Sequence, residues 1–157
     1  MKLTTHEISF NGGMLARGFW LYVWEITTSG GKVYYVGRTG DSSSLNAQSP
    51  FARISQHLGM NRKSNALRKN LENRQLSAEE CQKFRIFACG PIFQESRTKL
   101  EHTRSRDIVA ALEKALADSM SAAGYDVLNE VKCRISLNEK LWKQLRRQFA
   151  KTFQKLS

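Results

Sequence analysis

Two short runs of sequence decide the fold of this chain, WLYVWEI at residues 20–26 and VYYVGRT at residues 33–39. The stretch between them contains the turn-forming sequence Ser29-Gly30-Gly31. Both runs are rich in β-branched and aromatic residues, and two such runs on either side of a glycine turn are typical of a β-hairpin. We therefore expect a hairpin around which the rest of the chain is organised.

The alternation of side chains along a strand determines which residues share a face of this hairpin. Tyr22, Trp24 and Ile26 share one face of the first strand. By the same rule, Tyr35 and Gly37 share one face of the second strand. Each strand can therefore direct one phenol to the same side of the hairpin.

A helix is expected directly after the polar, turn-forming loop at residues 40–49. Pro50 suits the first turn of a helix, and Ser49 before it can cap the helix. Residues four positions apart lie on one helical face, which places Arg53 beside His57. Two phenols, a guanidinium and an imidazole can thus converge on one shallow surface.

With these residues the sequence resembles the GIY-YIG nuclease family. The two tripeptides of that family correspond to residues 20–22 and 35–37, although Trp20 and Leu21 replace the glycine and isoleucine of the first. The polar positions that match the family are, in chain order, Tyr22, Tyr35, Arg53, His57, Glu113 and Asn129. The resemblance covers roughly residues 19–130, and the matched positions occur in the family's order.

The resemblance implies an α+β fold with a small, mostly antiparallel three-stranded sheet flanked by helices, and the chain adds a further C-terminal helix. We expect an N-terminal extension at residues 1–18 and a nuclease-like domain at residues 19–130. Residues 131–157 then form a basic amphipathic helix that packs on the same domain. A domain of this size needs that helix to complete its core.

Other segments are assigned from their local patterns. Residues 7–10 alternate and predict a short edge strand or hairpin arm. A second helix is expected from Ala66. The aromatic run at residues 84–89 predicts a third, central strand that ends at Pro91.

The second half of the chain is expected to be mostly helical. Residues 94–107 are charged and poor in large apolar side chains, which indicates a loop or an irregular lead-in to a helix. From Asp107 an apolar stripe with helical spacing predicts a helix that ends at Gly124. A further helix is expected from Ser136, with its apolar stripe on the core.

The charge of the chain favours a polyanionic partner. The 157 residues include 25 Lys and Arg against 14 Asp and Glu, which gives a net charge of +11. Nucleic acid is the leading inference, since the basic residues are scattered through every segment and are not gathered in one block beside a membrane. We expect no membrane partner and a cytoplasmic location, because no apolar run is long enough to span a bilayer and residues 1–6 lack a secretory signal.

The three cysteines, Cys81, Cys89 and Cys133, show no Cys-x-x-Cys pair and no histidine at ligand spacing. Neither a disulfide framework nor a zinc site is indicated. We expect reduced, partly buried cysteines.

The matched residues suit the tasks of phosphodiester hydrolysis. The resemblance implies that Glu113 holds a divalent cation, Mg²⁺ or Mn²⁺, and a single carboxylate suffices when water and phosphate oxygens fill the other positions. Arg53 offers a planar fork of donors to phosphate oxygens. Tyr35 is the candidate for activating the water, and His57 a relay or proton donor, although an ordinary phenol has a pKa of about 10. Tyr22 would orient the water or the phosphate.

Three further residues are candidates for binding substrate. Arg38 and Lys63 are placed to contact the nucleic-acid backbone. Asn129 is assigned to the same group, although its amide can also tie loops together by hydrogen bonds. His6 and His102 are expected to be surface residues without a role.

The sequence thus predicts a metal-dependent endonuclease that cuts DNA, in a restriction, phage-defence or mobile-element setting. One alternative is a toxin-like ribonuclease with the same fold, and another is a nucleic-acid-binding module without catalysis. A palindromic target would require a two-fold dimer, so a homodimer is the expected assembly.

Overall fold

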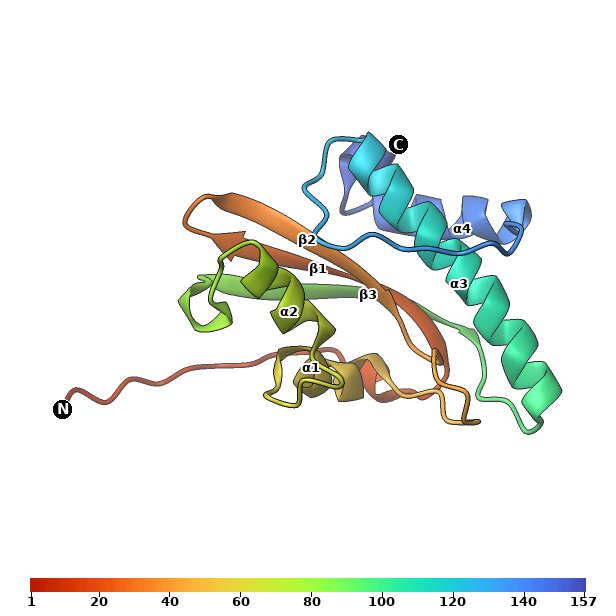
Figure 1. Ribbon diagram of the computed structural model, residues 1–157, viewed down its shortest axis with the longest axis horizontal. Helices are drawn as coiled ribbons and strands as arrows, with labels where there is room; N and C mark the ends of the chain where they lie inside the picture. Colours follow the sequence, from red (N-terminus) through yellow and green to blue (C-terminus); the bar gives the residue numbers. More distant parts are fainter.

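The expected hairpin forms two of the three strands in a computed structural model that describes residues 1–157 (Figure 1). Strand β1 (Phe19–Thr28) and strand β2 (Gly31–Arg38) are antiparallel, with Thr28 opposite Gly31. Gly31 has a φ of +126°, which favours glycine, and the Thr28 hydroxyl donates to the Gly31 carbonyl at 2.8 Å. A tight turn of two residues therefore sets the register of the hairpin.

The third strand, β3 (Lys83–Phe93), corrects two expectations. It pairs antiparallel with β1, so the strand order is β2-β1-β3 and β3 lies at an edge, not in the centre. It also continues through Pro91 to Phe93, where we expected it to end. The two corrections have one reason, because an edge strand tolerates a proline whose missing N–H has no second neighbour to bond.

Four α-helices and three short 3-10 turns complete the α+β fold. The elements are α1 (Pro50–Leu58), α2 (Ala66–Asn73), α3 (Lys99–Ala122), α4 (Glu139–Ala150), η1 (Gly12–Leu15), η2 (Ala78–Glu80) and η3 (Gln154–Leu156). Helices α1 and α2 lie on one side of the sheet, and α3 and α4 on the other (Figure 1). Ser49 caps α1 as expected, because its hydroxyl accepts the backbone N–H of Ala52 at 3.2 Å.

Helix α3 begins earlier than the apolar stripe indicates. Thr98 caps it by accepting the backbone N–H of Glu101 at 3.2 Å, so residues 99–107 are its first turns and not a loop. Helix α4 is also shorter than expected, since it begins after its cap Asn138 and leaves Phe153 beyond its end.

The N-terminal residues differ from the sequence prediction as well. Residues 7–10 form no strand, and residues 1–11 are exposed, with the N-terminal end of this segment leading away from the domain (Figure 1). Alternation alone does not make a strand when no neighbouring backbone supplies hydrogen bonds. Phe10 is still anchored, with its ring centroid 4.6 Å from that of Phe51 in α1.

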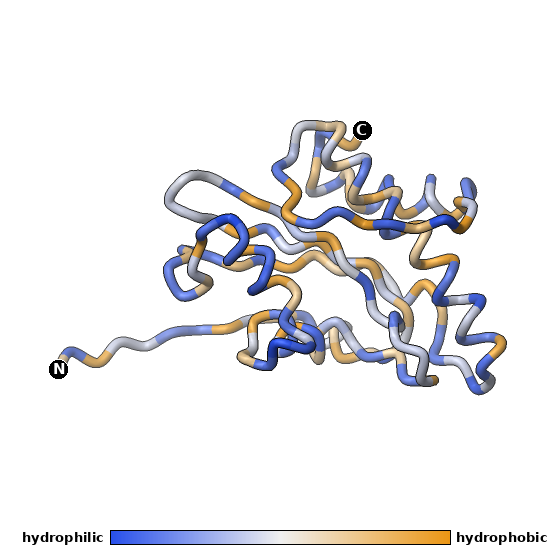
Figure 2. Tube along the Cα trace, viewed as in Figure 1, coloured by the Kyte–Doolittle hydropathy of each residue, from blue (hydrophilic) through white to orange (hydrophobic).

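The sheet separates two hydrophobic clusters. The cluster towards α3 and α4 has 16 buried residues, including Leu21, Val36 and Leu112. Trp142, Leu145 and Phe149 of α4 are buried in it, so α4 packs on the same face of the sheet as α3. The cluster towards α1 and α2 has eight. Hydrophobic and hydrophilic residues alternate along α3 and α4, as expected for helices with one packed face (Figure 2).

The two outer edges of the sheet are treated differently. Along β2, the backbone of Tyr34 bonds to the backbone of Asp126 and Leu128. The side-chain amide of Asn129 accepts from the N–H of Val36 and donates to its carbonyl. Along β3, no backbone hydrogen bond leads to any neighbour except β1. The backbone groups at the β2 edge are therefore hydrogen-bonded, whereas those at the β3 edge are not.

None of the helices has the length and apolar character needed to cross a bilayer.

Candidate active site

The two phenols predicted to share a face do so. Tyr22 and Tyr35 both belong to the cluster towards α1 and α2. Gly37 lies directly opposite Tyr22, and a Cβ atom at residue 37 would stand 2.5 Å from the Tyr22 ring. The glycine is thus required because the Tyr22 ring crosses β2 where a side chain would otherwise be.

Tyr22 contacts the imidazole that α1 supplies. Its hydroxyl lies 2.5 Å from Nε2 of His57 and 3.3 Å from the carbonyl oxygen of Arg38, while Nδ1 of His57 is buried without a partner. If Nε2 carries the proton, it donates to Tyr22, and Tyr22 donates to Arg38. This tautomer leaves neither the ring N–H of His57 nor the hydroxyl of Tyr22 unpaired, and we assign it on that ground.

Burial controls the protonation of these groups. The pKa of Tyr22 is raised well above its ordinary value, chiefly by burial. Burial likewise raises the pKa of Tyr35, and the nearby Glu113 adds to the effect. The pKa of His57 is lowered to about 4 by burial and then by the charge of Arg53. At neutral pH both phenols are therefore protonated and the imidazole is uncharged.

The hydroxyl of Tyr35 differs from that of Tyr22. The Tyr35 hydroxyl has no hydrogen-bond partner within the protein. It is also not one of the fully buried polar atoms that lack a partner, so solvent can reach it although the ring is buried. It is therefore free to bind a water molecule or a ligand.

Arg53 is held at the edge of the phenols by neighbours that sequence reasoning missed. Its Nη1 donates to Gln56 at 2.9 Å and its Nη2 to Asp41 at 3.3 Å, while its Nε is buried without a partner. A single aspartate in a polar loop carries no sequence signal for this role. A pocket of about 180 Å³ opens beside Arg53, lined by Gly40, Asp41, Ser42, Ser44, Asn46, Gln48, Arg53 and Gln56.

Glu113 reaches the same region from α3. Its Oε2 accepts a hydrogen bond from Nε of Arg38 at 2.9 Å, and both side chains are less than one-fifth exposed. Burial raises the pKa of Glu113 to about 7, although Arg38 opposes this shift. At neutral pH this carboxyl group is therefore only partly ionised.

The structure brings most of the candidate residues together and leaves others apart. Glu113 and Arg53 are both close enough to Tyr35 to shift its pKa, in opposite directions. Asn129 lies elsewhere, with its amide engaged by the backbone of Val36, which is the architectural role that its hydrogen-bonding capacity allows. Lys63 is exposed in the turn between α1 and α2, without a side-chain contact to these groups.

One histidine outside the site corrects an expectation. His102 is fully buried and not a surface residue. Its Nε2 lies 2.8 Å from the carbonyl oxygen of Ser42, and its ring packs 5.2 Å from that of Phe19. It joins the start of α3 to the loop that follows β2. His6 is exposed, as expected.

The donor set suits a hard cation that takes few protein ligands. No three His, Cys, Asp or Glu residues gather as a metal-binding group. Glu113 is nevertheless a largely buried carboxylate whose one ion-pair partner is Arg38, and Mg²⁺ retains most of its waters and uses one or two carboxylates with substrate phosphates. The residues present therefore fit such an ion.

The cysteines agree with expectation, since all three are free and partly buried.

The chain matches no protein-family model, no curated protein and no solved structure. A functional assignment must therefore come from the site and its chemistry.

Proposed function

We propose that this chain is a metal-dependent endonuclease of the GIY-YIG type that hydrolyses phosphodiester bonds in DNA. The observation that carries the proposal is the meeting of the free Tyr35 hydroxyl, the Arg53 guanidinium and the largely buried Glu113 carboxyl group, which come from three separate elements. Isolated tyrosine, arginine and glutamate residues are common. A cationic group and a carboxyl group around one unpaired phenol are a combination that suits phosphoryl chemistry, because the cation stabilises charge on the phosphate and the phenol can position a water.

Arg53 provides the charge for the transition state. Hydrolysis places additional negative charge on the phosphate oxygens, and a guanidinium can donate two parallel hydrogen bonds to them. Its side chain is only 19% exposed, so its charge is screened less than that of a surface arginine. Gln56 holds one arm of the guanidinium and leaves the other in contact with the exposed Asp41, a carboxylate that a phosphate can replace.

Glu113 would hold the cation, with Arg38 beside it. When bound there, Mg²⁺ supplies positive charge to a phosphate oxygen or to the departing oxygen. Arg38 fixes the position of the carboxylate from the end of β2. One of its two terminal nitrogens, Nη1, is buried without a partner and can turn to a phosphate oxygen.

Tyr35 and His57 divide the handling of the proton. The Tyr35 hydroxyl positions the attacking water, because it is the phenol without an internal partner. Its raised pKa makes it a poor base in the free protein, so the proton leaves either through Tyr35, whose pKa Arg53 lowers and a cation held by Glu113 would lower further, or through the uncharged His57. Tyr22 holds His57 in place through the bond at 2.5 Å.

The charge of the chain supports a polyanionic substrate. A net charge of +11 attracts the phosphate backbone without regard to sequence. A restriction, phage-defence or mobile-element role is the setting that we propose for a small nuclease of this kind.

Digestion of a mixed panel tests the proposal. The wild type, Glu113→Gln and the matched control Glu101→Gln, which alters an exposed glutamate of the same helix, are incubated with Mg²⁺ and duplex DNA, single-stranded DNA or tRNA. We expect the wild type and the control to cut duplex DNA. Glu113→Gln should retain binding and lose about 100-fold or more in rate, as is typical when one transition-state-stabilising group is removed.

Three other outcomes would each contradict the proposal. Cleavage confined to tRNA would identify a ribonuclease. Binding without cleavage by the wild type would identify a module that lacks catalysis. Equal rates for Glu113→Gln and the wild type would remove Glu113 from the site.

A further inference from the structure

The outer edge of β3 is built to receive another strand. Its backbone groups on that side have no hydrogen-bond partner within the chain, whereas β2 is closed by residues 126–129. None of the residues of β3 is buried, in contrast to those of β1, most of which are. A long unpaired edge with large apolar side chains is usually covered by something.

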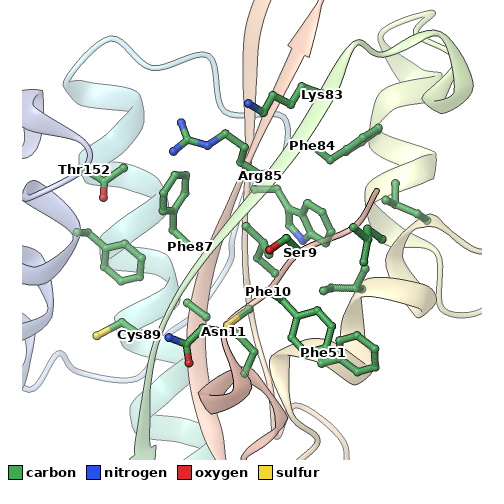
Figure 3. A pocket seen from close by; sticks show the side chains of 18 of the residues that line it. Ser9, Phe10, Asn11, Phe51, Lys83, Phe84, Arg85, Phe87, Cys89 and Thr152 are labelled. Atoms are coloured by element: carbon green, nitrogen blue, oxygen red, sulfur yellow. The ribbon is translucent and has the colours of Figure 1, made fainter. Parts of the chain in front are cut away.

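A hollow of about 1,000 Å³ follows this edge, and most of its lining residues are hydrophobic. It is bordered by residues 7–11 and α1 on one side of the sheet and by the end of α4 on the other. Figure 3 shows Phe87 and Cys89 on one side of β3, towards Thr152, and Phe84 on the opposite side, towards Phe10 and Phe51. The hollow therefore has the form of a slot into which a strand with two apolar faces fits.

The sequence of β3 is complementary to itself. An antiparallel pair centred on Phe87 places Arg85 opposite Cys89 of the other copy, and Ile86 opposite Ala88. A large side chain then faces a small one, and two Phe87 rings meet at the centre. The charged half of β3 faces the uncharged half of the other copy, so no like charges lie directly opposite.

We propose that β3 pairs with β3 of a second copy of this chain, which joins the two sheets into one of six strands. The axis of such an antiparallel pair is perpendicular to the sheet, so the faces that carry α1 and α2 lie on the same side of the dimer. If the proposed nuclease function holds, both sites face one duplex. The pairing itself does not depend on that function.

Mass measurement tests the association. Analytical ultracentrifugation should give about twice the chain mass of 17.9 kDa. The dimer fraction should increase with salt, because two chains of charge +11 repel each other and salt screens the repulsion. A monomer at every concentration and salt level would overturn the proposal.

Disulfide formation tests the register without reference to activity. In a chain with Cys81→Ser and Cys133→Ser, the change Arg85→Cys should give a cross-linked dimer under mild oxidation, through Cys89 of the second copy. Directly paired residues have Cα atoms about 4.5–5.5 Å apart, which a disulfide spans. The matched control Lys83→Cys lies two residues out of register, beyond the reach of a disulfide.

Three outcomes are decisive. Cross-linking by Arg85→Cys that is lost when Cys89→Ser is added supports the pairing. Cross-linking by Lys83→Cys in preference to Arg85→Cys contradicts the register. A dimer that neither variant cross-links, while its circular dichroism shows it to be folded, contradicts the use of the β3 edge.

Discussion

The two faces of the sheet serve different purposes. The face under α3 and α4 packs 16 buried residues, and its partners are almost all apolar. The face under α1 and α2 has half as many and buries the Tyr22 phenol and the His57 imidazole among them. Beside these groups, Nδ1 of His57 and Nε of Arg53 are buried without partners.

This difference indicates where stability and chemistry are located. A buried polar atom without a partner costs about 1–3 kcal/mol in proteins, so a face that keeps several is less stable than an apolar one would be. Such groups persist at sites where a ligand completes their hydrogen bonds. The face under α3 and α4 holds the domain together, whereas the face under α1 and α2, together with Glu113 supplied by α3, is available for a reaction.

The largest effect expected from the comparison is on stability. Leu116→Ala removes a fully buried side chain from the α3 face and should lower the free energy of unfolding by about 2–5 kcal/mol. Tyr35→Phe on the other face removes a hydroxyl without an internal partner and should change it by less than about 0.5 kcal/mol. Urea unfolding measures both, and DNA cleavage per folded molecule should show the reverse order. Equal losses of stability would abolish the distinction between the faces.

A smaller effect is expected at Gly37. The change Gly37→Ala places a Cβ atom against the Tyr22 ring and should cost about 1–3 kcal/mol by overpacking. It should also shift the ring from His57, and tyrosine fluorescence or the His57 NMR signals should report the shift. Gly12→Ala is the matched control, since nothing lies within 4 Å of its added Cβ atom. If Gly37→Ala behaves like this control, the close packing of Tyr22 on Gly37 is wrong.

The smallest effects concern pH. The pKa of Glu113, about 7 in the folded chain against an ordinary 4.5, means that its contribution to stability is present at low pH and is lost as pH rises through 7. His57 has the opposite sign, because its pKa of about 4 lies below the ordinary 6.5, so its contribution is lost as pH falls from 6.5 through 4. The two trends oppose each other between pH 4.5 and 6.5.

Single variants should separate these trends. Relative to the wild type, Glu113→Gln should gain stability as pH rises from 4.5 to 7, and His57→Gln should lose stability from 4 to 6.5. Unfolding in urea at a series of pH values measures both differences. A pH-independent difference for either variant would contradict the burial of that group.

Local pattern was sufficient for part of this structure. The alternation of Tyr22, Trp24 and Ile26 predicted their common face, and the four-residue spacing of Arg53 and His57 predicted their shared helical face. These features depend only on backbone geometry, which a short sequence determines. The hairpin and the capped start of α1 were predicted for the same reason.

Other features depend on contacts between distant parts of the chain. The position of β3 at an edge depends on whether it pairs with β1 or lies between the other two strands. Both strand orders are compatible with the local sequence pattern. His102 can be buried because its Nε2 has a hydrogen-bond partner in the backbone carbonyl of Ser42, which lies 60 residues earlier in the chain. Asp41 meets Arg53 through the course of a loop. Such contacts leave no periodic signal in the sequence.

The central claim is that separate side chains act as one site for phosphodiester hydrolysis. Its most direct test is a double-mutant cycle in single-turnover cleavage of duplex DNA with Mg²⁺, using the wild type, Tyr35→Phe, Glu113→Gln and the double variant. Residues that act as a unit are strongly non-additive. We predict that the double variant is no slower than the slower single variant, whereas losses that multiply, or a wild type that does not cleave, would contradict the claim.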